Sequence, residues 1–255
     1  MEVGVAGGRT GARDLAGALA LARAVAAAPG LRLCGIECFE GILPDTATVD
    51  ALLDQVIAVA EAAEAEGLFG DTGQIVLSAG GSAFYDRVGE RFAAARLGGR
   101  QVLKVIRSGC YLTHDSGGYA RAHERILKET RLALPPGRLE PALEVWAFVQ
   151  SRPEPAKAIV TMGKRDVSHD AALPQPTAWF RAAAMKVPAP MPAGHAVTAL
   201  NDQHCHLALP PDSPLAVGDM LCFGIAHPCT TFDKWDLLMV VDEDYTVVDA
   251  VKTYF

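Results

Sequence analysis

Residues 74–82 have the sequence QIVLSAGGS, in which a short apolar run passes directly into a turn of glycine and serine. Residues 101–109, QVLKVIRSG, repeat this order one unit later. Apolar residues at helical spacing precede the first turn over residues 46–66 and follow it over residues 84–96. Strands that alternate with helices of this length pair in parallel through right-handed crossovers. This stretch therefore predicts an α/β fold whose functional groups lie in the loops after the strands.

The same alternation extends on both sides and gives four, or four and a half, strand–helix units. An apolar run at residues 3–6 ends in the glycine-rich turn 7–11, and Asp14 is placed to cap the helix that follows. Residues 31–36 form a further buried strand, and the clearest helix begins at Asp45 or one residue later. A helix over residues 119–129 closes this half of the chain.

The second half of the chain has a different character, beginning at the Pro-Pro-Gly of residues 135–137. Prolines become frequent, and short loops separate apolar runs, as in an antiparallel β domain. We therefore expect one domain over residues 1–132 and a β domain over residues 133–255. Strands are predicted over residues 144–150, 157–162, 179–185, 196–201, 204–209, 220–226, 237–241 and 247–254.

Composition excludes several classes of protein. The 255 residues are 50% hydrophobic and 21% charged, which is enough apolar material for a sizeable core. The net charge of −7 and the lack of a run of basic residues argue against a nucleic-acid partner. No apolar run is long enough to cross a bilayer, and the first residues do not resemble a signal peptide. Six scattered cysteines predict free thiols or metal ligands in a reducing cytoplasm.

The loops after the two central strands are candidates for binding an anion. Backbone N–H groups and the dipole of the following helix favour a phosphate at residues 78–82 and again at residues 107–109. Neither loop matches the P-loop pattern, and residues 7–11 do not match the dinucleotide pattern. The alternative is that these glycines only form tight turns.

Two short segments carry residues that bind zinc in proteins. On a strand, His204 and His206 would point to the same face, and so would His227 and Cys229. Imidazole and thiolate are preferred zinc ligands, and a site with two protein ligands keeps positions open for water or substrate. The alternative is that these histidines are structural.

The motifs occur in an order that resembles the D-serine dehydratase and D-threonine aldolase group, which has the alanine-racemase-type fold. The combination is most similar to the bacterial amino-acid deaminases, also called D-serine deaminases, and it extends along essentially the whole chain. The segment HPCTTFD is the most specific of them. The motifs are GGRTG at residues 7–11, SAGGS at 78–82, RSGCY at 107–111, NDQH at 201–204 and HPCTTFD at 227–233.

The resemblance implies a lyase that uses pyridoxal 5'-phosphate (PLP) and zinc. It implies that residues 1–132 are the C-terminal half of a (β/α)8 barrel and that residues 133–255 are the β domain that follows it. His227 and Cys229 would bind the zinc, which contacts the β-hydroxyl of the substrate and makes hydroxide a better leaving group. The expected catalytic residues are His204, Gln203 and Tyr111, although Gln203 stands where relatives often carry glutamate. The expected cofactor-binding residues are Ser78, Gly80, Gly81, Ser82, Ser108, Gly109, Tyr111 and Arg9.

The implied reaction is elimination of water from a D-serine-type β-hydroxy amino acid, which gives a 2-oxo acid and ammonia. The family's imine lysine would precede Met1, because none of the seven lysines present lies in the matching motif. An inactive or zinc-binding fragment is therefore one alternative, and retro-aldol cleavage of the D-threonine aldolase type is another. A third is a PLP-independent zinc hydrolase that uses His204, His206, His227 and Cys229. A homodimer, or association with a missing N-terminal half, is the expected assembly.

Overall fold

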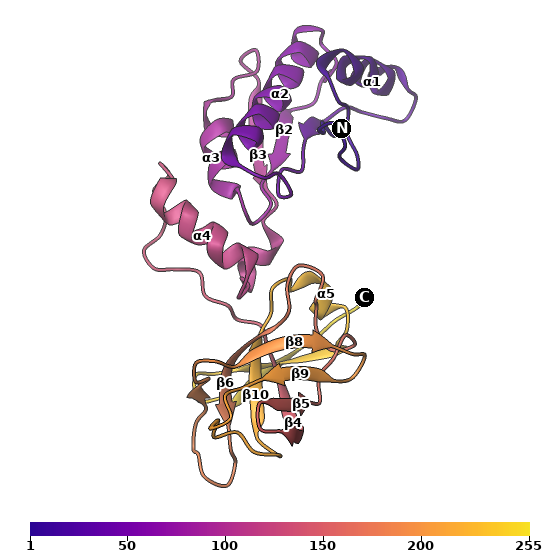
Figure 1. Ribbon diagram of the computed structural model, residues 1–255. Coiled ribbons are helices and arrows are strands. Elements are labelled where there is room, and N and C mark those ends of the chain that lie inside the picture. The colour runs from indigo at the N-terminus through magenta and orange to yellow at the C-terminus, as the bar shows by residue number, and fades with distance from the viewer. The chain divides into compact units, whose positions relative to one another are not determined.

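The computed structural model describes residues 1–255, which form two compact units (Figure 1). The first unit consists of Met1–Gly109 and Ala122–Gly137, and the second consists of Cys110–Arg121 and Arg138–Phe255. The segment that carries the predicted RSGCY motif is thus divided between them after Gly109. The predicted domains, 1–132 and 133–255, stay a prediction.

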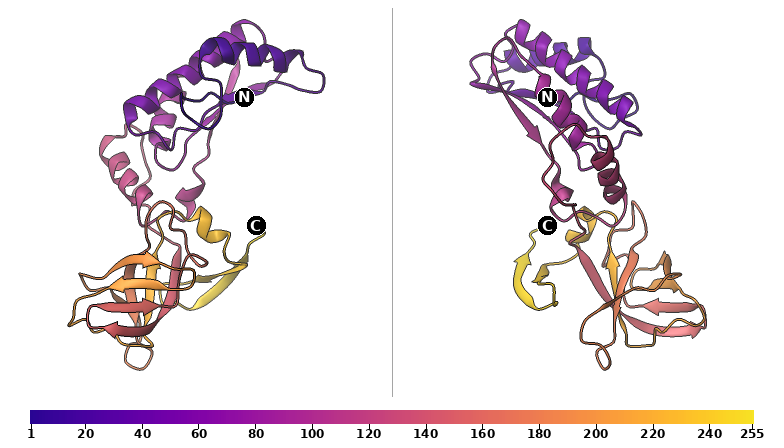
Figure 2. Two further views of the ribbon diagram at one scale, coloured as in Figure 1. Left: turned by 45° about the vertical axis from the view of Figure 1, so that its right-hand side comes forward. Right: turned by 90° about the vertical axis from the view of Figure 1, so that its left-hand side faces the viewer.

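A parallel sheet in the order β1-β2-β3 is the centre of the first unit. Its strands are β1 (Gly35–Glu37), β2 (Gln74–Ala79) and β3 (Gln101–Ile106), and Leu77 stands opposite Ile36 on one side and Lys104 on the other. Helices α2 and α3 lie on one face of this sheet (Figure 2). The helices of this half of the chain are α1 (Leu15–Ala27), α2 (Thr46–Ala65), α3 (Tyr85–Ala94) and α4 (Gly118–Glu129), with a 3₁₀ turn, η1, at Gly109–Leu112.

Two of the four predicted strands of this half are shorter than expected. The apolar run at residues 3–6 is reduced to single bridges at Glu2 and Val3, because the chain turns back at Gly7, whose φ is +75°. Leu31 is 61% exposed, so only the end of the predicted strand 31–36 reaches the sheet. The alternation of strands and helices is confirmed, but a partial (β/α)8 arrangement with four strands is not.

The predicted helix starts are confirmed. The Asp14 carboxylate accepts a hydrogen bond from the Gly17 N–H at 2.7 Å, and Asp45 accepts one from the Thr48 N–H at 2.8 Å. Each supplies a partner for an N–H group that the first turn of a helix leaves unpaired. The buried side of α2 packs against the sheet. It consists of Val49, Leu52, Leu53, Val56, Val59, Ala60 and Ala63.

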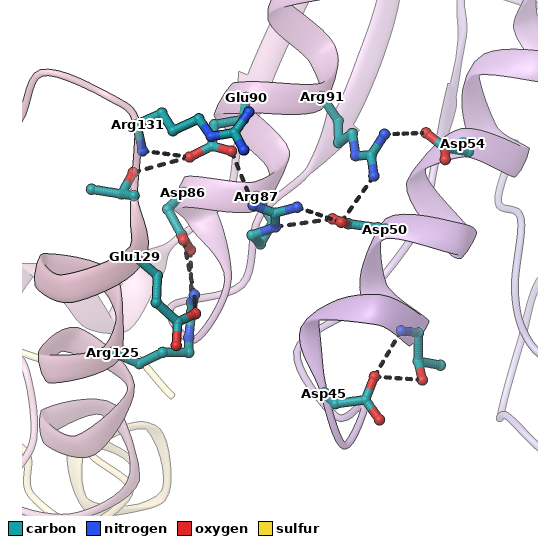
Figure 3. A network of polar contacts seen from close by, with 12 residues as sticks. Asp45, Asp50, Asp54, Asp86, Arg87, Glu90, Arg91, Arg125, Glu129 and Arg131 are labelled. Atoms are coloured by element: carbon teal, nitrogen blue, oxygen red, sulfur yellow. Dashed lines mark hydrogen bonds and ion pairs between the residues drawn. The ribbon is translucent and has the colours of Figure 1, made fainter.

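Ion pairs join the outer surfaces of α2, α3 and the second half of α4 (Figure 3). Asp50 of α2 accepts hydrogen bonds from Arg87 and Arg91 of α3. Burial raises the pKa of Asp50, but these two hydrogen bonds outweigh it and the pKa lies below the usual value. Asp86 of α3 is paired with Arg125 of α4, and its side chain is completely buried.

The second unit contains an antiparallel seven-stranded sheet in the order β7-β6-β10-β4-β5-β9-β8, which confirms the predicted antiparallel β domain. Its core is formed by side chains such as Val149, Val160, Leu207, Leu221 and Phe223. The strands are β4 (Glu144–Glu154), β5 (Lys157–Val160), β6 (Gln175–Phe180), β7 (Ala189–Pro190), β8 (Ala196–Leu200), β9 (Cys205–Ala208) and β10 (Met220–Gly224).

A short helix and a separate ribbon follow the sheet. Helix α5 (Cys229–Phe232) comes directly after β10, and β11 (Leu237–Val241) pairs with β12 (Val247–Lys252) in an antiparallel ribbon. The ribbon exposes many apolar side chains, among them Met239 and Val248. Its Tyr245 ring meets the Trp146 ring of β4 edge to face, with the centroids 5.3 Å apart. None of the helices combines the length and hydropathy needed to cross a membrane.

Candidate functional site

His227 lies between β10 and α5, and a carboxylate holds its ring. The Nδ1 atom is 2.6 Å from the Asp170 Oδ2 atom, and the Thr230 hydroxyl donates to the other oxygen of Asp170 at 3.3 Å. Because a carboxylate only accepts, Nδ1 carries the proton, and in the neutral ring Nε2 has a free lone pair. Nε2 has no hydrogen-bond partner in the structure. A carboxylate behind one nitrogen is the usual support for a histidine that binds a metal through the other.

The contact with His227 also affects the pKa of the Asp170 carboxyl group. Burial raises the pKa of Asp170, but the hydrogen bonds from His227, the backbone and Thr230, together with the electrostatic interaction with His227, outweigh burial and leave the pKa below its usual value. The carboxylate is therefore ionised at neutral pH and available as an acceptor. No local pattern marks Asp170, which lies 57 residues before its partner His227.

Cys229 begins α5 and meets a second thiol. Its Sγ atom is 3.2 Å from Sγ of Cys110, a residue of η1. Burial, together with the hydrogen bond to Cys229, raises the pKa of Cys110 to about 12. The Tyr119 hydroxyl contacts Cys110, and burial followed by the charges of the two sulfur groups raises the pKa of Tyr119 to about 12. Cys110 lies in the RSGCY motif, in which the resemblance implies roles for Ser108, Gly109 and Tyr111 but none for Cys110.

The His227–Cys229 pair does not lie on a strand, as the period-two argument assumed. Strand β10 ends at Gly224, and Pro228 has helical angles of −55° and −34° as the residue before α5. The two side chains therefore project from the entrance of a helix. No three His, Cys, Asp or Glu side chains in residues 1–255 are gathered as a metal site.

The predicted catalytic residues His204, Gln203 and Tyr111 are exposed. Strand β9 begins at Cys205, so His204 lies in the preceding turn and does not share a strand face with His206, contrary to the prediction. The His206 Nε2 atom instead bonds to Asn201 Oδ1 at 2.6 Å. Gln203 is exposed in the same turn, and Tyr111 is 53% exposed in η1. Their catalytic roles stay predictions.

The glycine loop after β2 binds an anion from the protein itself. The N–H groups of Gly80 and Gly81 donate to the two carboxylate oxygens of Glu40 at 3.0 and 2.6 Å. Glu40 is completely buried, and Gly80 has a φ of +93°, which favours glycine. The Ser108 hydroxyl donates to the Gly80 carbonyl at 2.6 Å and holds the loop from β3. Glu40 lies forty residues before the loop, so local pattern could not reveal this contact.

The part of the loop nearest α3 remains available for a phosphate. The Ser82 hydroxyl and the N–H groups of Ser82 and Ala83 have no hydrogen-bond partner, and they precede the start of α3 at Tyr85. Free N–H groups before a helix favour an anion. The Ser78 hydroxyl is engaged, because it accepts from Arg107 at 2.6 Å and donates to the Val105 carbonyl at 3.3 Å.

Arg9, also predicted to bind the cofactor, lies over the Phe39 ring at 4.8 Å. Because the ring contacts the face of the guanidinium group, the N–H groups at its edge remain available to bind an anion. The assignments of Arg9, Ser108 and Gly109 to the cofactor stay predictions.

Replacing Glu40 tests how the loop is held. We expect Glu40→Ala to lower the free energy of unfolding by about 2 kcal/mol, because it leaves one buried and one half-buried N–H group without an acceptor. Glu40→Gln keeps one acceptor oxygen and should lose about half as much. Urea unfolding measures both values. Equal stability of wild type and Glu40→Ala would contradict this account of the loop.

Comparison with known protein families matches residues 142–241 to the family described as "Putative serine dehydratase domain". The curated 3-hydroxy-D-aspartate aldolase of Paracoccus denitrificans (strain Pd 1222) is 28% identical over 181 residues. That match covers 68% of this chain and 42% of the aldolase. The resemblance expected from the motifs is confirmed.

Solved structures show the same fold. D-threonine aldolase from Filomicrobium marinum matches 97% of this chain and 61% of its own, with a TM-score of 0.67 and 21% identity. D-threo-3-hydroxyaspartate dehydratase from Delftia sp. HT23 matches 100% of this chain and 65% of its own, with a TM-score of 0.62 and 21% identity. These are alanine racemase-like folds, and the chain spans less than two thirds of the length of these relatives.

A D-threo-3-hydroxyaspartate dehydratase has also been solved as two alanine variants. One replaces a cysteine and is described as the metal-free form, and the other replaces a histidine two positions earlier in that chain. The spacing of these two residues is the spacing of His227 and Cys229 in this chain.

Proposed function

We propose that this chain, whose residues 142–241 match the model of the serine dehydratase domain, acts in the PLP- and zinc-dependent removal of water from β-hydroxy D-amino acids. D-Serine is the substrate type we propose, and the products are a 2-oxo acid and ammonia. The similar proteins named above are dehydratases and aldolases of D-hydroxy amino acids, and they support the general reaction class.

One observation carries the proposal: the Asp170 carboxylate holds the His227 ring with Nε2 free, and Cys229 follows two residues later. His227 and Cys229 would hold the metal, and Asp170 fixes the tautomer and the orientation of the imidazole. The metal-free description of the cysteine variant of D-threo-3-hydroxyaspartate dehydratase supports this pair, since the spacing is the same. Two protein ligands leave positions open for the substrate.

A bound zinc would polarise the C–O bond of the substrate's β-hydroxyl as a Lewis acid. Tyr119, whose pKa is about 12, keeps its proton at neutral pH and remains a hydrogen-bond donor beside the two sulfur atoms. The thiol of Cys110 is also protonated, since its pKa is about 12. Cys229, the more exposed of the two cysteines, is the one we assign to the metal.

The donors of the glycine loop fit a phosphate at Ser82 rather than at Gly80. We propose that the Ser82 hydroxyl and the N–H groups of Ser82 and Ala83 hold the cofactor phosphate, while Glu40 fixes Gly80 and Gly81 behind them. PLP, when bound, supplies an electron sink for the loss of the Cα proton.

A second candidate is a metal-binding protein without lyase activity of its own. It is favoured by the lysines, because none lies in the motif that the resemblance assigns to the imine. Lys104, on β3, donates to the Ala93 carbonyl at 3.1 Å. Reduction with borohydride in the presence of PLP separates the candidates, since the second gives no pyridoxyl-lysine.

Product analysis tests the proposed reaction. The purified protein is supplied with PLP, zinc and D-serine, and we expect pyruvate and ammonia in equal amounts. EDTA should stop the reaction, and zinc should restore it. Glycine together with an aldehyde would instead identify retro-aldol cleavage. No turnover and no trapped lysine would overturn the first candidate in favour of the second.

A further inference from the structure

Two thiols meet at the proposed metal site although their residues are far apart in the sequence. The Sγ atoms of Cys110 and Cys229 are 3.2 Å apart, and the residues are separated by 119 positions. Both lie in the second compact unit. A disulfide bond is about 2.0 Å long, so the two sulfur atoms need to approach by only about 1.2 Å to form one.

The other four cysteines have no such partner. Cys38, Cys205 and Cys222 are buried, and Cys34 is exposed but contacts only the Arg32 carbonyl, at 3.6 Å. Cys229 is exposed and Cys110 is partly exposed. An oxidant in solution can therefore reach this pair, and no other two cysteine sulfur atoms of the chain are in contact.

We propose that Cys110 and Cys229 are a redox modification site, in which a hydroperoxide converts the two thiols to a disulfide and thereby removes Cys229 from the metal. This inference rests on the proposed metal site. With Cys229 in a disulfide, His227 is left as a single ligand, which does not retain zinc. A dithiol restores both thiols and with them the site.

The steps balance with hydrogen peroxide as the oxidant. The Cys229 thiolate attacks one peroxide oxygen, the O–O bond breaks, and a sulfenic acid and one water form. The Cys110 sulfur then attacks the sulfenic sulfur, the S–O bond breaks, and a second water leaves. The two thiols lose two protons and two electrons, which reduce the peroxide to water. Cys110 is thus the resolving cysteine, held beside Cys229 by the fold.

The neighbouring groups fit this role. The Tyr119 hydroxyl contacts Cys110, and the Asp115 carboxylate accepts the N–H groups of Gly117 and Ala120 at 2.9 and 3.0 Å. These hydrogen bonds hold the segment between η1 and α4 to the first turn of α4. The resolving sulfur therefore sits on an ordered segment. A bound zinc should protect the pair, because its bond to Cys229 occupies the nucleophilic sulfur.

Peptide mass analysis of the metal-free protein tests the proposal. After hydrogen peroxide and without reductant, we expect one cross-linked peptide pair that contains Cys110 and Cys229 and lacks two hydrogens. Zinc binding should be lost on oxidation and return with dithiothreitol. Cys34→Ser is the matched control, an exposed cysteine away from the pair, and it should give the same cross-link.

The Cys110→Ser variant separates the proposal from its rivals. We expect it to bind zinc normally when reduced, and to lose zinc irreversibly after peroxide, because no thiol is left to resolve the sulfenic acid. Loss of zinc from the reduced variant would show that Cys110 is a metal ligand and would overturn the proposal. So would oxidation of wild-type Cys229 to sulfinic acid without a cross-link. A protein that forms the cross-link but binds no zinc would refute the proposed function alone.

Discussion

Cys229→Ser and His227→Ala are each expected to abolish zinc binding and to slow elimination from D-serine by at least about 1000-fold. The reason is that His227 and Cys229 are the two ligands of the proposed site, so losing either would leave a single donor. A Lewis acid at the leaving hydroxyl contributes several kcal/mol to such a reaction, and each 1.4 kcal/mol is a factor of ten. Metal content by mass spectrometry and initial rates of pyruvate formation measure the two effects.

His206→Ala is the control for this prediction. His206 lies on β9 and bonds to Asn201, so its loss should leave zinc content unchanged. The same variant decides against the zinc hydrolase alternative, which needs a third ligand from His206 or His204. Zinc lost from His206→Ala and retained in Cys229→Ser would contradict the proposed site and favour the hydrolase.

Arg125→Ala is expected to lower the free energy of unfolding by about 3–5 kcal/mol. The Arg125 guanidinium donates to both oxygens of Asp86, at 2.9 and 2.7 Å, and also to the Ala83 carbonyl at 3.0 Å. The Asp86 side chain is completely buried, so removing its partner leaves an uncompensated charge between α3 and α4 (Figure 3). Urea unfolding followed by helical circular dichroism measures the loss.

Arg91→Ala provides the comparison, because this arginine also bridges two helices in the same network. Its side chain is 38% exposed, and its partners Asp50 and Asp54 are closer to water, so we expect a loss of less than about 1 kcal/mol. Asp86→Asn combined with Arg125→Met should recover part of the stability, since no buried charge remains. If Arg125→Ala and Arg91→Ala were equally stable, the buried pair would not have the role assigned to it.

Local pattern predicted the features of this chain that depend on neighbouring residues. The caps Asp14 and Asp45 and the buried side of α2 follow from spacing over one or two helical turns. Most strands of the β domain follow from short apolar runs between turns. The two-residue β7 was missed, and the strand predicted over residues 179–185 was wrong beyond its first two residues, because β6 spans Gln175–Phe180. A shift of one residue at the start of β9 was enough to remove His204 from the strand, and with it the argument that paired it with His206.

The contacts that build the site are long-range, and no local signal marks them. Asp170 reaches His227 across 57 residues, and Cys110 reaches Cys229 across 119. The glycine loop was predicted to favour an anion, and it binds one, but the anion on Gly80 and Gly81 is the carboxylate of Glu40. Sequence thus indicated which segments carry chemistry, and tertiary structure determined which atoms in them are free.

Titrating zinc into the metal-free, reduced protein, with PLP and D-serine present, tests the central claim most directly. Bound zinc and the rate of pyruvate formation are measured in the same samples. The account predicts that both rise together and saturate at one zinc per chain, and that Cys229→Ser shows neither. Pyruvate formation that does not depend on zinc, or zinc bound equally well by Cys229→Ser, would contradict it.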